Sequence, residues 1–150
     1  MRVRDFQPSD TAACLRIFDG NVPQYFHREE RAAYAEFLAD LPGPYLVVED
    51  GTRAVVACGG LAIDPERRRA DMCWGMVDAA RHRQGVGRLL LVERIGRARA
   101  MPGIAVIRLN TSQHTTGFYA RFGFELRGVL RDGYAPGLDR CDMELVLMPA

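Results

Sequence analysis

The first part of the chain combines one short extended run with two helical stretches. Residues 2–6 alternate polar and apolar side chains, as a half-buried strand does, and residues 8–10 are typical of a turn before a helix. Two apolar stripes at helical spacing follow. They consist of Cys14, Ile17 and Phe18, and then of Tyr34, Phe37, Leu38 and Leu41. The pattern predicts a strand and two helices, the second beginning near Glu29 and ending before residues 42–44.

The middle of the chain changes from extended runs to a helical period. Residues 45–49 and 53–61 are strand-like and are joined by Asp50-Gly51-Thr52, a strong hairpin signal. A third strand-like run covers residues 70–77. Apolar and small residues then recur at helical spacing at Gly87, Leu90, Leu91, Ile95, Ala98 and Met101. We expect an antiparallel meander followed by one long helix that ends at residues 102–103.

The last third predicts three strands and one short helix. Residues 104–109 form a nearly continuous apolar run, which is typical of an interior strand covered on both faces. A short helix is expected over residues 115–121. Strands over 124–130 and 141–147 should flank a loop at 132–140. The long helix and the strands on either side of it predict a right-handed crossover unit.

Composition limits the classes of function. The 150 residues suit one domain with a real core, and 48% are hydrophobic and 26% charged. A formal net charge of +1 gives no general field for nucleic acid or for an anionic membrane, so neither is expected as a partner. All the basic side chains are arginines, which excludes a Schiff-base lysine.

Cysteine and histidine spacing predicts no metal site. Cys14, Cys58, Cys73 and Cys141 form no CxxC pair, and the three histidines at 27, 82 and 114 are dispersed. Free thiols are expected. The first ten residues have no apolar signal core and no apolar run is long enough to span a bilayer, which favours a cytoplasmic enzyme.

The segment RHRQGVGR at residues 81–88 lies where a strand has ended and the long helix begins. Helix N-termini present unpaired N–H groups, and glycines let the backbone approach a phosphate closely. A tight turn with solvated arginines is the alternative interpretation. The dinucleotide fingerprint GxGxxG is not met, because Leu90 stands at its third glycine, and no GK[ST] follows to complete a P-loop.

This segment is similar to the acetyl-CoA-binding motif [RQ]xxGx[GA] of the GNAT acetyltransferases. Gly85 and Gly87 match its two small positions, while His82 stands at its first. The resemblance implies acetyl-CoA as co-substrate and no metal. It also implies that Met76 and Val77 run beside the pantetheine arm, with an N–H of one of them facing the reacting carbonyl. The remaining cofactor contacts implied are Arg83, Gln84, Val86 and Arg88.

A second stretch resembles another signature of the same family, in which an aromatic pair precedes Gly-Phe. Phe118-Tyr119 and Gly123-Phe124 match it, whereas Ser112 replaces the usual Asn and Thr115 the usual Ala. The resemblance implies Tyr119 as the proton donor to the departing CoA thiolate, with Ser112, Thr115 and Phe118 near the cofactor. The alternative is that Tyr119 only packs against its aromatic neighbours.

The resemblance implies an α/β (α+β) fold with a mixed, mostly antiparallel sheet of six or seven strands. About four helices should flank the sheet, which should be splayed at the acetyl-CoA site. The acceptor would be a small-molecule amine or a peptide N-terminus, and a homodimer is possible. Candidate acceptor contacts are Asn21, Tyr25, Phe26, Trp74 and Tyr134. Trp74 could equally fill the core.

The sequence leaves the base and two alternative functions open. An amine must lose a proton before it attacks, and the sequence does not identify the base. Candidates are Asp71, Cys73, Asp142, Glu144 and water. A non-catalytic acyl-CoA-binding sensor would share the fold and the loop. An RNA-binding domain that uses the arginines at 67–69 is a third hypothesis.

Overall fold

The computed structural model describes residues 1–147 and shows a seven-stranded sheet with four α-helices. The strands are β1 (Arg2–Asp5), β2 (Tyr45–Glu49), β3 (Val55–Asp64), β4 (Arg69–Val77), β5 (Val106–Thr111), β6 (Glu125–Ala135) and β7 (Leu138–Val146). The helices are α1 (Thr11–Gly20), α2 (Arg31–Ala39), α3 (Val86–Ala100) and α4 (Thr116–Ala120). Short 3-10 turns at Pro8–Asp10, Arg28–Glu30 and Ala79–Arg81 precede α1, α2 and the loop before α3.

The hydrogen-bonded strand order is β1-β2-β3-β4-β5-β7-β6. The hairpin predicted around Gly51 is confirmed, because β2 and β3 pair antiparallel from Tyr45 opposite Gly60 to Glu49 opposite Val55. The strands β4 and β5, which flank α3, pair parallel between Arg69–Asp71 and Val106–Arg108. The expected mixed, mostly antiparallel sheet is therefore confirmed. The expected splay of β4 and β5 beyond these pairs stays a prediction.

Residue contacts divide the chain into two compact units. The first contains Met1–Ala62 and Cys73–Arg97, and the second contains Ile63–Met72 and the chain from Ala98 onward. Two strands, β3 and β4, and the helix α3 each contribute residues to both units. The expectation of a single domain stays a prediction.

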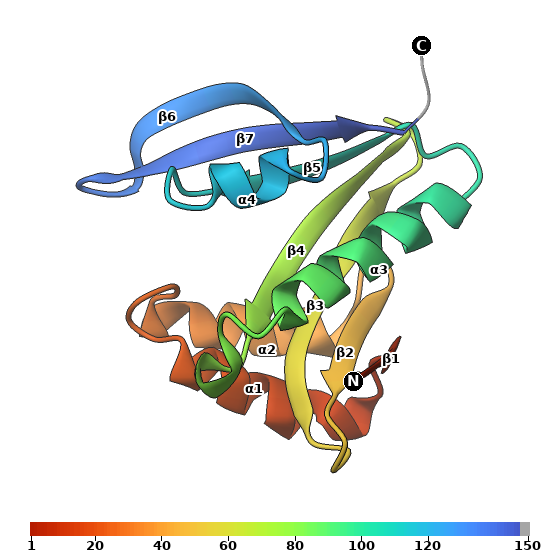
Figure 1. The fold of residues 1–150 in the computed structure, drawn as a ribbon, viewed down its shortest axis with the longest axis vertical. Helices are drawn as coiled ribbons and strands as arrows, with labels where there is room; N and C mark the ends of the chain where they lie inside the picture. The colour runs from red at the N-terminus through yellow and green to blue at the C-terminus, as the bar shows by residue number, and fades with distance from the viewer. Residues whose placement is uncertain (148–150) are drawn as a thin grey trace. The chain divides into compact units, whose positions relative to one another are not determined.

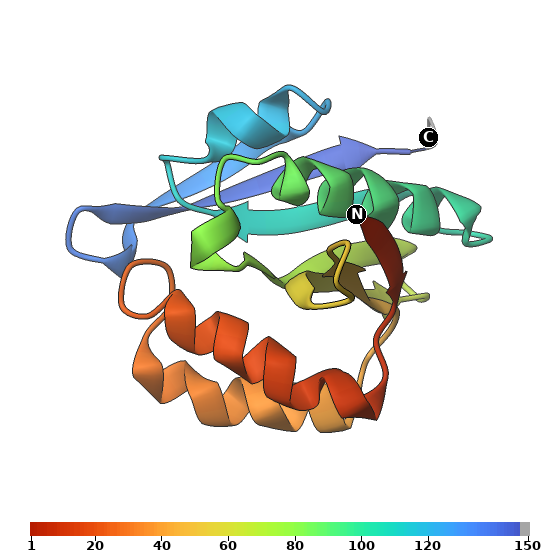
Figure 2. The same cartoon turned by 60° about the horizontal axis from the view of Figure 1, so that its bottom comes forward.

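The first unit has helices on both faces of its strands. Side chains alternate along β2, so Tyr45 and Val47 pack with α1 and α2, whereas Leu46 and Val48 pack with Val86 at the start of α3. Figure 2 shows α1 and α2 on one side of these strands and α3 on the other. This layering places the start of α3 and the helical pair α1–α2 on opposite faces of the same strands.

The second unit contains the parallel start of β4, the strand β5 and a long β6–β7 hairpin (Figure 1). The prediction of a loop at 132–140 is wrong, because β6 extends to Ala135 and β7 begins at Leu138. The many polar and glycine residues of 132–140 are compatible with a strand such as β6, which is exposed along most of its length. Tyr134 accordingly belongs to β6.

The burial pattern of β5 also differs from expectation. We expected both faces of this strand to be covered, but burial alternates, with Ile107 and Leu109 buried and Val106 and Arg108 only partly so. An apolar run by itself does not distinguish full coverage from half coverage. The interior position of β5 in the sheet is confirmed.

Candidate functional site

The loop that leads into α3 has the backbone geometry of an anion cradle. Arg83 and Gly85 both have left-handed backbone angles, with φ of 65° and 81°, and α3 begins at the next residue, Val86. The first helical hydrogen bond runs from Leu89 N–H to the Gly85 carbonyl at 3.1 Å, so the N–H groups of Val86 and Gly87 precede the helical ladder. A Cβ built on Gly85 meets no atom within 4 Å. Backbone donors, open space and the positive helix end fit a diphosphate.

The side chains around this loop differ in exposure. Arg81 donates to the Asp50 carboxylate at 2.7 Å and ties the loop to the β2–β3 hairpin. The hydrogen bonds from Thr52 and the nearby Arg81 lower the pKa of Asp50, so this partner stays charged. Arg83, Gln84 and Arg88 are exposed. Solvent-facing arginines beside a cradle of N–H groups suit recognition of phosphate oxygens.

The carbonyl of Val77 is held by two of the predicted site residues. Asn21 Nδ2 donates to it at 2.9 Å, and His82 Nε2 lies 2.9 Å from it. Asn21, which is 3% exposed, also donates to the Ile17 carbonyl at 2.8 Å. The His82 ring is therefore bonded to the end of β4, and Asn21 joins α1 to the same point. Direct contacts of either side chain with a ligand stay predictions.

These bonds bear on which amide of β4 could face a reacting carbonyl. Asp78 N–H donates to the Val56 carbonyl of β3 at 2.8 Å. Because successive amides of an extended strand point to opposite edges, the Val77 amide points away from β3. The sequence left Met76 and Val77 as alternatives. The observed bonding favours Val77.

Trp74 has an unusual backbone conformation just upstream. Its φ is 45°, in the left-handed region that a bulky residue rarely adopts. Its carbonyl accepts a hydrogen bond at 2.8 Å from the hydroxyl of Tyr45, which is itself 2.7 Å from the Tyr34 hydroxyl. Tyr34 continues the chain to the thiol of Cys58 at 3.2 Å. Burial raises the pKa of both phenols, which therefore stay protonated and available as donors.

The predicted acceptor contacts of the first unit gather on the α1–α2 face. Trp74 stacks on Tyr34 with ring centroids 4.9 Å apart and on Phe26 at 6.0 Å. Tyr25 is 61% exposed and meets the His82 ring edge-on at 5.4 Å. Trp74 thus packs in an aromatic cluster, which agrees with the alternative that it fills the core. Tyr25 presents its phenol to solvent.

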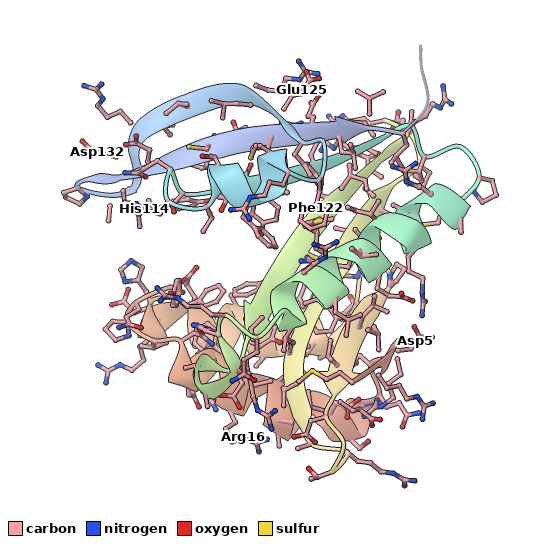
Figure 3. The ribbon with its side chains drawn as sticks, viewed as in Figure 1. Asp5, Arg16, His114, Phe122, Glu125 and Asp132 are labelled. Atoms are coloured by element: carbon pink, nitrogen blue, oxygen red, sulfur yellow. The ribbon has the colours of Figure 1, made fainter. Side chains whose placement is uncertain are left out.

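In the second unit, α4 carries the predicted proton donor. The Tyr119 ring is half-buried between Phe118 at 5.1 Å and Phe124 at 5.9 Å. Its hydroxyl forms no hydrogen bond with any of residues 1–147. Figure 3 shows His114 and Phe122 at the two ends of this helix. The packing fixes the ring and leaves the phenol available to a ligand.

The turn before α4 uses the hydroxyls that were expected at the cofactor. Thr115 Oγ1 bonds Thr111 Oγ1 and lies 3.3 Å from the Ser112 carbonyl, while Ser112 Oγ accepts from His114 N–H at 3.3 Å. These side chains shape the turn, and their contact with a cofactor stays a prediction.

Tyr134 belongs to the same unit as Tyr119 and lies close enough for the two phenols to interact electrostatically. Partial burial, together with the neighbouring Asp142 carboxylate, raises the pKa of Tyr134. Gln113 was not singled out from the sequence. It donates to the Gly137 carbonyl at 2.9 Å and accepts from Asp139 N–H at 2.8 Å, which ties the turn before α4 to the tip of the hairpin.

The carboxylates considered as bases are all engaged in ion pairs. Asp71 pairs with Arg69 at 2.9 Å, Asp142 with Arg140 at 3.3 Å, and Glu144 with Arg108 at 3.4 Å. Within residues 1–147 no group of histidine, cysteine or acidic side chains could hold a metal ion. No helix in that part of the chain is long and apolar enough to cross a membrane.

Two further features of the structure were not predicted from the sequence. Arg94 is buried on the sheet-facing side of α3, at a position where the helical period would place an apolar residue. The signal was present, because Arg94 follows Leu90 by four positions in the apolar stripe. The hydrogen bonds of Tyr45 could not have been predicted, because Tyr45 lies 11 positions from Tyr34 and 29 positions from Trp74 in the chain.

Comparisons with known proteins agree with this architecture. An aminoglycoside 6'-N-acetyltransferase complexed with coenzyme A superposes with a TM-score of 0.82 at 14% identity, covering 100% of this chain and 99% of that one. The ribosomal-protein-S18-alanine N-acetyltransferase of Escherichia coli gives 0.82 at 18% identity, covering 99% and 95%. A spermidine N-acetyltransferase variant from Vibrio cholerae gives 0.78 at 15%, covering 98% and 95%. These likenesses show the fold.

The family assignment comes from the sequence. A search of curated proteins found no match. The family model described as "Acetyltransferase (GNAT) family" matches residues 12–124, which include both the loop before α3 and the α4 segment. The chain therefore belongs to the GNAT acetyltransferase family.

Proposed function

We propose that this protein transfers an acetyl group from acetyl-CoA to a primary amine by direct attack in a ternary complex. The observation that carries the proposal is the cradle before α3, where the amides of Val86 and Gly87 and the open space at Gly85 suit a diphosphate. Family membership supports acetyl-CoA as the donor. Its thioester supplies an acyl carbon that an uncharged amine can attack.

The backbone of β4 would hold the thiol-bearing arm and orient the thioester. The Val77 amide is our candidate donor to the carbonyl oxygen, because it points away from β3, and because Asn21 and His82 hold the carbonyl of the same residue, on the following peptide. A donor fixed before the reaction stabilises charge on that oxygen without reorganisation. Asn21 and His82 are then positioning residues.

Tyr119 would complete the transfer. As the amine nitrogen bonds to the acyl carbon, the carbon–sulfur bond breaks and the sulfur leaves as a thiolate. The Tyr119 hydroxyl donates a proton to that sulfur, the amine releases its own proton to water, and the phenolate of Tyr119 regains a proton from water. The unbonded hydroxyl and the aromatic packing of the ring support this role. With Asp71, Asp142 and Glu144 already paired to arginines, water is the favoured acceptor of the amine proton.

The acceptor class is an amine on a small molecule or at a peptide N-terminus. As the aromatic surface for the acceptor we propose the part-buried rings of Phe26 and Trp74, which stack 6.0 Å apart, together with the exposed ring of Tyr25. These rings suit the apolar part of such an acceptor, or a cation over a ring face. Fold neighbours carry names that specify an aminoglycoside, a ribosomal-protein alanine and spermidine, all of which present amines.

The test is release of free CoA thiol in the presence of a panel of amines, for the wild type and for Tyr119→Phe and Tyr134→Phe. We expect Tyr119→Phe to lower kcat about a hundredfold while the Kd of acetyl-CoA changes less than twofold. Tyr134→Phe, which alters the neighbouring phenol, should change the KM of the amine and not kcat. Unchanged turnover of Tyr119→Phe would remove Tyr119 from the reaction. Binding of acetyl-CoA without turnover by any amine would favour the non-catalytic sensor.

A further inference from the structure

One arginine lies within the buried face of α3. Arg94 is 5% exposed, and its helical neighbours Leu90, Leu91 and Ile95 are buried as well. Its guanidinium occupies space left by two glycines, Gly59 on β3 and Gly75 on β4. A Cβ added to Gly59 would lie 3.2 Å from Arg94 Cζ, and one added to Gly75 would lie 3.0 Å from Nη2.

This guanidinium makes no hydrogen bond or ion pair with residues 1–147, and its Nε is buried without a hydrogen-bond partner. Its charge interacts electrostatically with the buried thiol of Cys58, which is not an ion-pair partner. The other two buried polar residues are satisfied, since Asp10 pairs with Arg4 at 2.8 Å and Asn21 bonds two carbonyls. An unpaired charge in a protein interior costs several kcal/mol. A cation in this place therefore calls for an anionic partner from outside the chain.

The layering of the first unit indicates which ligand could bring that anion. Gly59 follows Cys58 along β3, and Cys58 packs with α1 and α2, so Gly59 faces α3. The aromatic surface proposed for the acceptor belongs to the α1–α2 face. The ligand that shares a face with Arg94 is the one held at the start of α3. Gly75, beside the guanidinium, is exposed, which gives a route to it.

The diphosphate cannot be the partner. Arg94 lies eight positions after Val86, which is about 12 Å along a helix. Phosphates bound at the first turn are too far away to pair with it. The neutral carbonyls of the pantetheine arm would leave the guanidinium charge of Arg94 uncompensated, because a buried charge is balanced by an opposite charge. A carboxylate at the acyl end of the donor meets both conditions.

We propose that Arg94 is the receptor for a carboxylate on the acyl chain, so that the site accepts acyl-CoA donors with a dicarboxylic acyl group such as succinyl-CoA. The guanidinium fork binds a carboxylate through two parallel hydrogen bonds. This proposal rests on the proposed function, since it assumes that the acyl-CoA binds at the start of α3. It adds the acyl class that the site prefers.

The test compares Kd values of acetyl-CoA and succinyl-CoA by calorimetry for four proteins. These are the wild type, Arg94→Met, Arg94→Lys and Arg99→Met, in which an exposed arginine of the same helix is the matched control. We expect the wild type and Arg99→Met to bind succinyl-CoA about thirtyfold more tightly, a difference of about 2 kcal/mol. Arg94→Met should lose that difference, and Arg94→Lys should keep only a small part of it.

A second readout needs no ligand. Arg94→Met removes an unpaired buried charge and keeps an apolar chain, so its Tm without ligand should equal or exceed that of the wild type. Equal wild-type affinities for the two donors, or a preference that survives in Arg94→Met, would overturn the proposal and leave the proposed function intact. Binding of neither donor by folded protein would overturn both.

Discussion

Gly85→Ala separates the folding role of the cradle from its binding role. In the structure Gly85 has a φ of 81° and open space where a Cβ would be placed. An alanine there meets no clash, so the cost to folding is the left-handed backbone strain alone, about 1 kcal/mol. For a chain of this size that lowers the Tm by about 2–4 °C. The added methyl also enters the space in which we place the diphosphate.

Gly103→Ala is the matched control for this change. Gly103 has nearly the same φ, 83°, and equally open surroundings, but it lies after α3 instead of before it. Both variants should lose similar stability in thermal unfolding. Titration followed by the fluorescence of Trp74, the single tryptophan, should show acetyl-CoA binding weakened at least tenfold in Gly85→Ala alone. Equal affinities of the two variants would refute the assignment of the cradle.

Three further substitutions test the left-handed turn at Trp74, the Asp10 ion pair and the Gln113 tether. Tyr45→Phe removes the donor to the Trp74 carbonyl and should lower the free energy of unfolding by about 1–3 kcal/mol in urea titrations. An unchanged free energy of unfolding would show that this hydrogen bond does not stabilise the left-handed turn at Trp74. Asp10→Asn tests the pH dependence of stability. The hydrogen bond from Arg4 lowers the pKa of Asp10. The contribution of Asp10 to the free energy of unfolding is therefore present above the ordinary carboxyl pKa of about 3.9 and is lost as pH falls. The variant should be less stable than the wild type at pH 7, and the gap should shrink on acidification; a gap independent of pH would contradict this origin. Gln113→Ala frees the hairpin tip from the turn before α4 and should speed hydrogen exchange at Asp139 N–H, with unchanged exchange counting against the tether.

Much of the architecture was predictable because local signals agreed with it. The Asp50-Gly51-Thr52 turn gave the first hairpin, and the apolar period after Gly87 gave α3, whose observed bounds are Val86–Ala100. The β6–β7 hairpin was missed around Tyr134 because an exposed strand carries no alternation of burial for the sequence to display. A periodic apolar pattern reflects the burial of one face, and an exposed edge strand buries few side chains.

The candidate site was predictable to a different degree. The glycine loop was found because backbone chemistry favours glycine where φ is positive, as at Gly85. The roles of Asn21 and His82 at the Val77 carbonyl could not be predicted, since they depend on contacts 56 and 5 positions apart. That Arg94 lacks an ion-pair partner likewise could not be predicted, because it depends on the neighbouring strands and not on the position of Arg94 along the apolar face of α3.

In the proposed function, the amides that open α3 bind the diphosphate of an acyl-CoA. Isothermal titration of acetyl-CoA into the folded wild-type protein measures this binding. We expect saturable binding of one molecule per chain, which free CoA, with the same diphosphate, competes away. Absence of binding heat at every temperature tested, with the protein shown to be folded, would contradict it.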